Sequence, residues 1–460
     1  MKGISTSLTG RLLTLLAVAA IVPSGRASRA EDSAGPVAVK ARRIHVGDGR
    51  TIENGILLIE NGRIRAVGND VKIPPGTPVI EIDGGEMTPG LIDANARVET
   101  AELIAPSRKP PQQEIDPAHI EEDGDTDPSP LAVGVRTSAV ISEQGSEVVP
   151  HTRVLDGLHL GGRDFDRLAR GGVTTAYASP DASSVIGPRG AIVHTGGPCP
   201  QRVLMAAAAV KATVGSDPSM LGSYNRQPYG NTVSLYARRP NSRMGLTWVF
   251  RKAFYDAIRR GDGLTAYGAD TASPEASDVL REVLEGKAPL RIQARIQQDI
   301  LTALRLADEL KLRFTLEEAT EAYRCIEELR AASVPVVFGP IYEQPGGIRL
   351  RGGEGRRSRY YTFRALIEAG IPTALSAQEL REEDGLARQA MYAIRFGVDF
   401  DEALRAVTQV PAQMLGLDKE LGTLEPGKRA DVVLWTGRPF AATSLAAVVL
   451  IDGNVVVDRR

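Results

Sequence analysis

Cysteine, histidine and long apolar segments are all scarce in this chain. Its 460 residues include only two cysteines and five histidines. Cys199 and Cys325 can form at most one bridge and neither belongs to a C-x-x-C pair, so a disulfide framework is excluded. The formal net charge is −2, so no global field favours nucleic acid or an anionic membrane as a partner.

The longest apolar run lies near the N-terminus, at residues 12–22, where it follows Lys2 and Arg11. Helix-breaking residues 23–25 come next, and small residues stand at 28 and 30. The run is too short to span a bilayer comfortably, so residues 1–30 are predicted to be a secretory signal peptide. An uncleaved anchor is the alternative. The mature protein is expected to be exported, periplasmic or extracellular, without membrane attachment.

Short strands separated by turns are predicted at both ends of the chain. Asn61-Gly62 is a dipeptide typical of β-hairpin turns. Strands are predicted at 55–59, 64–67, 79–82, 430–435, 448–451 and 455–457. We therefore predict a small β-sandwich domain assembled from residues 37–90 and 419–460.

The middle of the chain alternates strands with amphipathic helices. The strand 290–294 is followed by a helix at 299–310, whose apolar residues recur at helical spacing. Further strands are predicted at 313–317, 334–338 and 372–376, and further helices from Ser273, around Ile326 and at 363–369. Repeated units of this kind build a parallel sheet, open or closed into a barrel.

Residues 99–150 interrupt this pattern. They are rich in proline, serine and acidic residues, with an acidic knot at 121–125 that lacks the full spacing of a calcium-binding loop. We expect an irregular acidic excursion at the surface.

Three stretches resemble the amidohydrolase superfamily, and its imidazolonepropionase-like members in particular. They are MTPGLIDA at 87–94, GGVTT at 171–175, and 406–431, which ends in GTLEPGKRAD. The resemblance implies an α/β fold: a TIM-like (β/α)8 barrel over residues 91–418, with the split β-sandwich domain beside it. It also implies hydrolysis of carbon–nitrogen bonds other than peptide bonds, with zinc or another divalent metal at the strand C-terminal ends.

The residues at that family's metal-ligand positions are altered here. The corresponding positions are Asn95, Arg97, Gln293, Arg295, Glu318 and Gln378. Arginine has no lone pair to donate and stays protonated, so it repels a divalent cation. A bound metal lowers the pKa of its water from about 15.7 to about 7, and nothing at these positions replaces that effect. We therefore predict no metal and no cofactor.

The five histidines do not rebuild a metal site, because no pair has H-x-H or H-x-x-x-H spacing. Only His194 is expected at a strand end that faces the barrel mouth. Arg97 and Arg295 are instead expected to approach Glu318 near the empty metal position, in a buried network of arginine, glutamate and glutamine.

A glycine-rich stretch after the strand 334–338 carries several arginines, including Arg349, Arg351, Arg356 and Arg357. It is interpreted either as a mobile basic lid over an anionic ligand or as a solvated loop. The segment 422–428 matches G-x-x-x-x-G-K formally, but Arg429 replaces the required serine or threonine.

The leading prediction is an exported amidohydrolase-family protein that has lost catalysis. It would act as a binding or partner protein, for a small molecule at the barrel mouth or for a homologous subunit, and not for nucleic acid. The alternative is an active, metal-independent hydrolase of a small amide or cyclic amide. Glu318 would then be the general base, and Arg97 or Arg295 would stabilise the oxyanion.

Overall fold

The computed structural model describes residues 35–98, 146–219, 240, 242–265, 272–341, 359–378 and 385–460. The chain divides into Met1–Ala34 and Gly35–Arg460, and the second unit holds every described residue. The predicted signal peptide, most of the acidic excursion and the four lid arginines lie outside the described residues. Within the described ranges, no helix is both long and apolar enough to cross a membrane.

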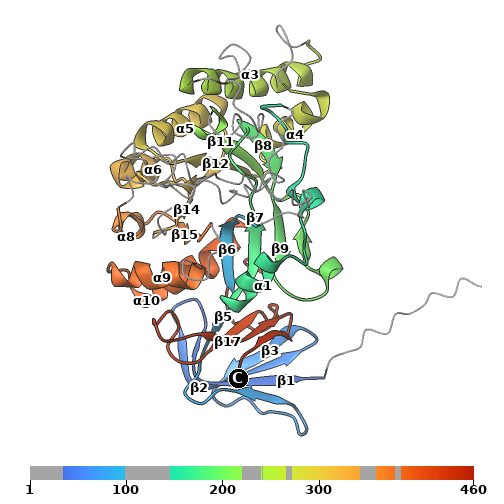
Figure 1. Ribbon diagram of the computed structural model, residues 1–460, viewed down its shortest axis with the longest axis vertical. Helices are drawn as coiled ribbons and strands as arrows, with labels where there is room; N and C mark the ends of the chain where they lie inside the picture. Colours follow the sequence, from blue (N-terminus) through green and yellow to red (C-terminus); the bar gives the residue numbers. More distant parts are fainter. Residues whose placement is uncertain are drawn as a thin grey trace, which may run out of the picture. The chain divides into compact units, whose positions relative to one another are not determined.

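Strands from both ends of the sequence form one eight-stranded sheet. Its order is β18-β17-β16-β5-β1-β2-β3, with β4 paired to β1. Figure 1 shows the two ends, in blue and red, meeting in this sheet, where β16 pairs antiparallel with β5. The strands are β1 Val37–His45, β2 Thr51–Glu60, β3 Arg63–Gly68, β4 Val79–Glu81, β5 Glu86–Pro89, β16 Val432–Trp435, β17 Ala446–Ile451 and β18 Asn454–Asp458.

The hairpin between β2 and β3 follows from its turn residues. Asn61 and Gly62 have φ angles of 53° and 74°, the left-handed pair that a two-residue hairpin turn needs. Leu57 in β2, Ile64 in β3 and Val432 in β16 are buried in one apolar cluster. Side chains from both ends of the sequence therefore share a core.

The middle of the chain forms two further sheets, with orders β10-β9-β7-β6 and β15-β14-β13-β12-β11-β8. Their strands are β6 Leu91–Ala96, β7 Val173–Ala178, β8 Ile186–Arg189, β9 Ala191–His194, β10 Val203–Met205, β11 Val210–Thr213, β12 Leu290–Ala294, β13 Phe314–Glu318, β14 Val336–Phe338 and β15 Thr373–Leu375. The pairs β6–β7 and β11 through β15 are parallel. All residues of β6 and β12 are buried, as expected of parallel strands covered on both faces.

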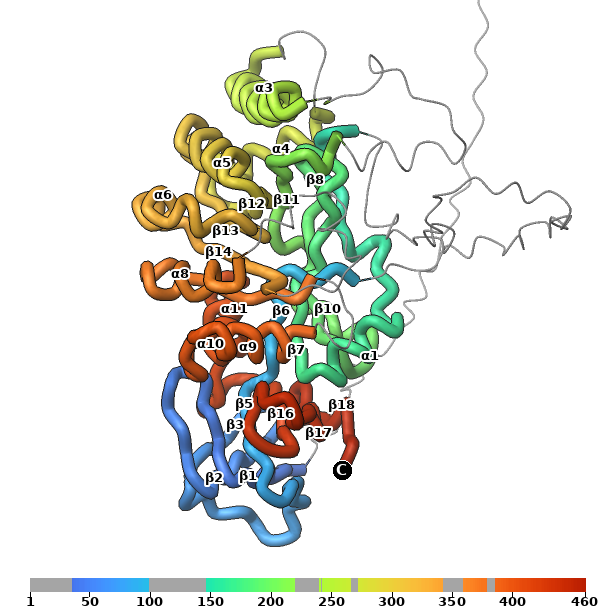
Figure 2. The backbone as a smooth tube through the Cα atoms, turned by 60° about the vertical axis from the view of Figure 1, so that its left-hand side comes forward, coloured from blue at the N-terminus to red at the C-terminus, as the bar shows by residue number. Residues whose placement is uncertain are grey.

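Helices connect the parallel strands and cover one side of them. Figure 2 shows α5, α6 and α8 in a row beside β12 to β14. The helices are α1 Arg163–Arg170, α3 Arg243–Gly261, α4 Pro274–Leu284, α5 Gln297–Leu310, α6 Ile326–Ala331, α8 Thr362–Glu368, α9 Leu386–Arg395, α10 Phe400–Ala406 and α11 Gln409–Met414, with 3-10 turns at Val154–Gly157, Cys199–Gln201 and Ala322–Arg324. Ser273 caps α4 by accepting a hydrogen bond from the Ala276 amide.

The two middle sheets are linked at two places. On one side, Gly190 alone separates β8 from β9. A Cβ at Gly190 would lie 2.3 Å from the Tyr177 ring, so only glycine fits there. On the other side, the amide of Arg97, just after β6, donates to the carbonyl of Gln378, which follows β15, at 3.0 Å.

The two cysteines do not form a bridge. Both are free thiols, with Cys199 exposed and Cys325 buried.

Candidate functional site

Neighbouring parallel strands bring charged side chains together towards their C-terminal ends. β11, β12 and β13 run side by side, with Thr213 opposite Gln293 and Gln293 opposite Glu317. The register therefore places the C-terminal ends of β11, β12 and β13 next to one another. Because carboxyl ends of parallel strands meet at one edge, residues far apart in the sequence converge here.

Glu318 is the first centre of this cluster. Arg97 donates to one of its carboxylate oxygens at 3.0 Å, and Nε of Arg295 donates to the other. The side chains of Arg97, Arg295 and Glu318 are 11%, 4% and 0% exposed. The predicted approach of both arginines to Glu318 is confirmed, and neither points into bulk solvent.

Asp217 extends the network from the helical residues 217–219, which follow β11 after three residues. Its carboxylate accepts a hydrogen bond from Arg295 at 2.8 Å and another from Gln293 at 2.7 Å. Burial by itself would lower the pKa of Arg295, but Asp217 and Glu318 raise it well above its ordinary value. Arg295 is therefore a permanent cation held between two carboxylates.

Glu317 is the second centre. It accepts hydrogen bonds from Lys211 and Arg291, and all three side chains are almost fully buried. Burial alone would raise the pKa of Glu317, but the two cations hold it below its ordinary value. Burial lowers the pKa of Lys211, and Glu317 opposes that shift. Arg291 also stacks on the Tyr177 ring, 4.1 Å from its centroid.

Asn95, Gln293 and Gln378 stand at the positions where the resemblance implies metal ligands. Their amide side chains are buried, and some of their polar atoms have no hydrogen bond in the described part of the chain. Both side-chain polar atoms of Asn95, Oε1 of Gln293 and Nε2 of Gln378 lack a hydrogen-bond partner within the described residues. Glu318 and Gln378 also adopt left-handed backbone conformations, with φ of 67° and 56°. Such strain costs about 1–3 kcal/mol per residue and is concentrated at functional sites.

Lys211 and Asp217 belong to the buried network but were not predicted from the sequence. Neither lies in a stretch that resembles the amidohydrolases, and each becomes significant only through contacts across strands. Lys211 lies in a four-residue buried strand, β11. A lysine inside such a short apolar strand was the available signal, because an unpaired buried lysine is rare.

The prediction that His194 faces the same edge is wrong. β9 is antiparallel to β7, with His194 opposite Thr175 near the start of β7. His194 therefore lies away from the strand C-terminal ends, next to Asp431 and Asp452 at 3.5 and 3.7 Å. The sequence did not reveal the reversed direction of β9.

In the described part of the chain, His194, Asp431 and Asp452 each offer one ligand atom, and these atoms lie within 4.8 Å of one another. The three side chains could therefore surround a metal. Arg429 already contacts this group. Its Nη1 donates to His194 Nε2 at 2.7 Å and lies 3.1 Å from the Asp452 carboxylate. The positive charge that lies against His194 and Asp452 is therefore the guanidinium group of Arg429.

Residues 313–457 match the amidohydrolase family. An amidohydrolase structure from Thermotoga maritima MSB8 covers 92% of this chain and 100% of its own, with a TM-score of 0.74 and 25% identity. The amidohydrolase tasK of Hapsidospora irregularis is 23% identical over 88% of this chain, which spans only 40% of that relative's length. The imidazolonepropionase of Rhizorhabdus wittichii is 49% identical over 74 residues, 15% of this chain and 18% of its own. These similarities confirm the resemblance to amidohydrolases, and the amidohydrolase neighbours imply a fold of the TIM-barrel type.

The buried network does not fit the divalent metal that the amidohydrolase resemblance implies. Its cationic side chains are Arg97, Lys211, Arg291 and Arg295, and its carboxyl groups are Asp93, Asp217, Glu317 and Glu318. Asp217, Glu317 and Glu318 therefore already have cationic partners, and Asp93 accepts hydrogen bonds from the Asn95 and Ala377 amides. A divalent ion would bring two further positive charges next to arginines that cannot deprotonate.

Proposed function

We propose that this chain is an amidohydrolase-type protein in which an ion-pair network has replaced the catalytic metal, and that it acts by binding rather than by hydrolysis. One observation carries the proposal: Arg97 and Arg295 both bond to Glu318 in a buried position. The similarity to amidohydrolases supports the family, and the donor set supports the loss of the metal. Without a metal-bound water, the nucleophile of the family's reaction is missing.

The contacts at both sheet edges support a closed (β/α)8 barrel as the scaffold. A path around it would run β6, β7, the β9–β8 segment, β11, β12, β13, β14 and β15. Hydrogen bonds from Arg97 to Gln378 and from Ser376 Oγ to the Asn95 carbonyl would complete the circle. Beside it, the sheet built from both termini would fold over into the β-sandwich.

Metal-independent hydrolysis with Glu318 as general base is the less favoured alternative. A general base must reach the proton it abstracts and must have a free lone pair directed at it. Arg97 and Arg295 donate to both carboxylate oxygens of Glu318. These contacts favour a role for Glu318 in holding the strand ends together.

Metal analysis of the purified chain tests the proposal most directly. The chain is incubated with zinc, manganese or iron, passed over a desalting column and analysed by mass spectrometry, beside the Thermotoga amidohydrolase treated identically. We expect far less than one equivalent of metal in this chain and no hydrolysis of imidazolone or amide substrates. Stoichiometric metal, together with hydrolysis that a chelator abolishes, would contradict the proposal.

We also propose that residues 1–30 direct export to the periplasm or the medium. The apolar run behind Lys2 and Arg11 supports this. Replacing Leu15 and Leu16 with arginine should retain the full-length chain in the cytoplasm, whereas the wild type should appear outside it, shortened by the signal peptide. Export that is insensitive to these changes would contradict the proposal.

A homologous subunit, if it is the partner, should co-purify with the exported chain.

A further inference from the structure

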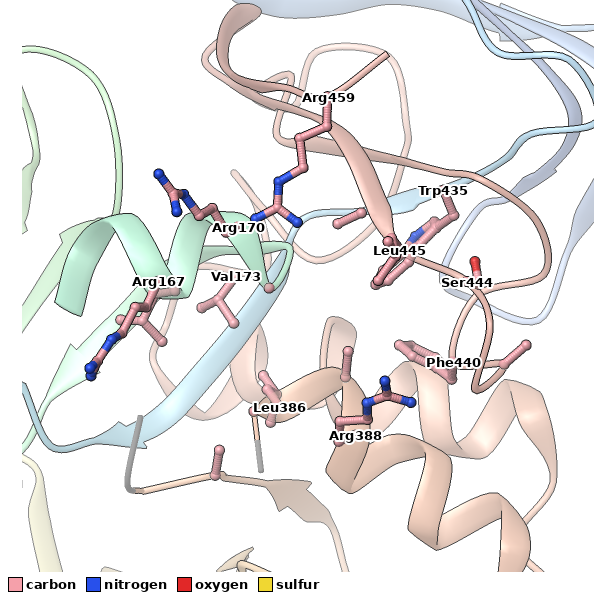
Figure 3. A pocket seen from close by; sticks show the side chains of 17 residues that line it. Arg167, Arg170, Val173, Leu386, Arg388, Trp435, Phe440, Ser444, Leu445 and Arg459 are labelled. Atoms are coloured by element: carbon pink, nitrogen blue, oxygen red, sulfur yellow. The ribbon is translucent and has the colours of Figure 1, made fainter. Parts of the chain in front are cut away.

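A cavity lies between α1, the start of α9 and the C-terminal strands β16 to β18. Its volume is about 320 Å3. Val173, Leu386, Trp435, Phe440 and Leu445 give it apolar walls, as Figure 3 shows. This volume is at the lower end of the roughly 300–1,000 Å3 typical of small-molecule sites.

The charged side chains at this cavity are all of one sign. Arg167 and Arg170 come from α1, Arg388 from α9 and Arg459 from the chain end after β18, and no aspartate or glutamate is among the described residues that line the cavity. In Figure 3 the side chains of Arg388 and Arg459 enter from opposite sides. All four line one cavity, so their positive potentials add there.

The four arginines differ in how many of their N–H groups are already hydrogen-bonded within the described residues, and Arg170 and Arg459 have the most free donors. Arg167 pairs with Asp164 at 3.1 Å, and Arg388 donates to the Ala442 carbonyl at 3.3 Å. The guanidinium groups of Arg170 and Arg459 make no hydrogen bond or ion pair with any residue that the structure describes. Each guanidinium carries five N–H donors in a fork that matches carboxylate, sulfonate and phosphate oxygens.

We infer that this cavity binds a small amphipathic anion, with an aromatic or branched alkyl group against Trp435 and Leu386 and an anionic head at the arginines. Apolar walls stabilise the body of such a ligand through burial, while the one-signed rim selects its charge. The arginines that line the cavity do not belong to the Glu318 network, although Ala377 borders both the cavity and Asp93. The inference does not depend on whether that network has lost its metal. It would give the proposed binding protein a ligand.

Fluorescence titration with 8-anilino-1-naphthalenesulfonate tests this inference on the full chain. The matched probe is N-phenyl-1-naphthylamine, which has the same rings without the sulfonate. We expect the sulfonate to bind about tenfold more tightly, the effect of one charge-assisted contact. Phenyl phosphate should displace it at lower concentration than inorganic phosphate, because only the ester has an apolar body.

Paired variants locate the site. Arg170→Gln with Arg459→Gln should weaken binding of the sulfonate about tenfold and leave the neutral probe unchanged. Arg305→Gln with Arg330→Gln removes two exposed arginines elsewhere on the chain and should change neither. Thermal unfolding midpoints confirm that both pairs fold. Ala441→Trp, which places an indole in the cavity, should weaken both probes.

Three outcomes would overturn the inference. The first is equal weakening by the two arginine pairs, which would indicate general charge attraction. The second is displacement by inorganic phosphate as effective as that by phenyl phosphate. The third is binding that appears only after Glu382→Gln, Glu383→Gln and Asp384→Asn, because that result would assign the cavity to the chain's own acidic stretch.

Discussion

Two clusters in this molecule place arginine among side chains that could otherwise surround a metal, and they differ in burial. At the strand C-terminal ends, Arg295 and Glu318 are 4% and 0% exposed. Beside the C-terminal sheet, Arg429 and Asp452 are 28% and 36% exposed. The first arginine is a fixed part of the interior, whereas the second can exchange with water.

The difference determines what each arginine does. Removing one partner of a buried ion pair leaves an uncompensated charge, which costs several kcal/mol, whereas a half-exposed pair contributes about 1 kcal/mol or less. The donors also differ. Asn95, Gln293 and Gln378 are weak donors for a divalent ion, but His194, Asp431 and Asp452 are good ones. Loss of Arg295 should therefore destabilise the first cluster, whereas loss of Arg429 should free the second cluster to bind a metal.

The largest effect is expected from Arg295→Met. This change leaves Asp217 and Glu318 buried without their shared cation, so we expect the free energy of unfolding to fall by about 3–5 kcal/mol. Urea denaturation followed by circular dichroism measures it. Adding Asp217→Asn to Arg295→Met should recover part of the loss, because Glu318 keeps Arg97 as its partner whereas Asp217 would otherwise stay charged without a cation.

The matched control is Arg330→Met, whose ion pair with Glu327 lies at the surface, with side chains 61% and 73% exposed. Its effect should stay within about 0.5 kcal/mol. If Arg295→Met were no more destabilising than this control, the two clusters would not differ as burial requires.

A smaller, pH-dependent effect is expected at Glu317. Its pKa in the folded chain lies below the ordinary value, so the stability it contributes is present above about pH 4.3 and is lost as the pH falls through the folded pKa. Glu317→Gln lacks this contribution. The stability difference between wild type and variant should therefore shrink on acidification, by about 1.4 kcal/mol for each unit by which the pKa is lowered.

Denaturation at a series of pH values between neutral and strongly acidic tests this expectation. Glu327→Gln is the control, because that carboxylate is 73% exposed and its replacement should give a nearly constant, small difference. A difference for Glu317→Gln that grew on acidification would reverse the sign of the argument.

Much of the fold could be predicted from the sequence, because the relevant patterns are local. The strand at residues 290–294 was predicted with the bounds observed for β12, and the Asn61-Gly62 turn fixed the hairpin of β2 and β3. Arg97 was predicted to lie at this site because it stands three residues after the MTPGLIDA stretch, and Arg295 because it follows the predicted strand 290–294. Their contact with Glu318 followed from strand order alone.

The remaining features depend on contacts that no local pattern contains. Lys211 and Asp217 act through Glu317 and Arg295, which lie at least 78 positions away in the sequence. His194 was placed on the wrong side because the three apolar residues before it do not reveal the direction of their strand. The cavity at Arg170 and Arg459 combines a helix with the end of the chain, and only packing brings these together.

Arg429→Ala is expected to lower the free energy of unfolding least and to show the clearest difference between the two clusters. Removal of this half-exposed side chain should lower the free energy of unfolding by about 1 kcal/mol or less. It also frees His194 Nε2, because Arg429 donates to that atom in the wild type. Nδ1 of His194 faces the Thr174 carbonyl at 3.3 Å, which keeps the ring proton there and leaves Nε2 as the donor to a metal.

We therefore expect Arg429→Ala to bind zinc through His194, Asp431 and Asp452 after small side-chain adjustments, since zinc–ligand distances are about 2.0–2.2 Å. Zinc at 100 times its dissociation constant should raise the stability of this variant by about 2.7 kcal/mol. Adding Asp452→Asn should abolish the gain. Zinc should have no such effect on Arg295→Met, because Arg97 still donates to Glu318 and repels a divalent ion. Equal responses of the two arginine variants would show that burial and donor type do not separate the clusters.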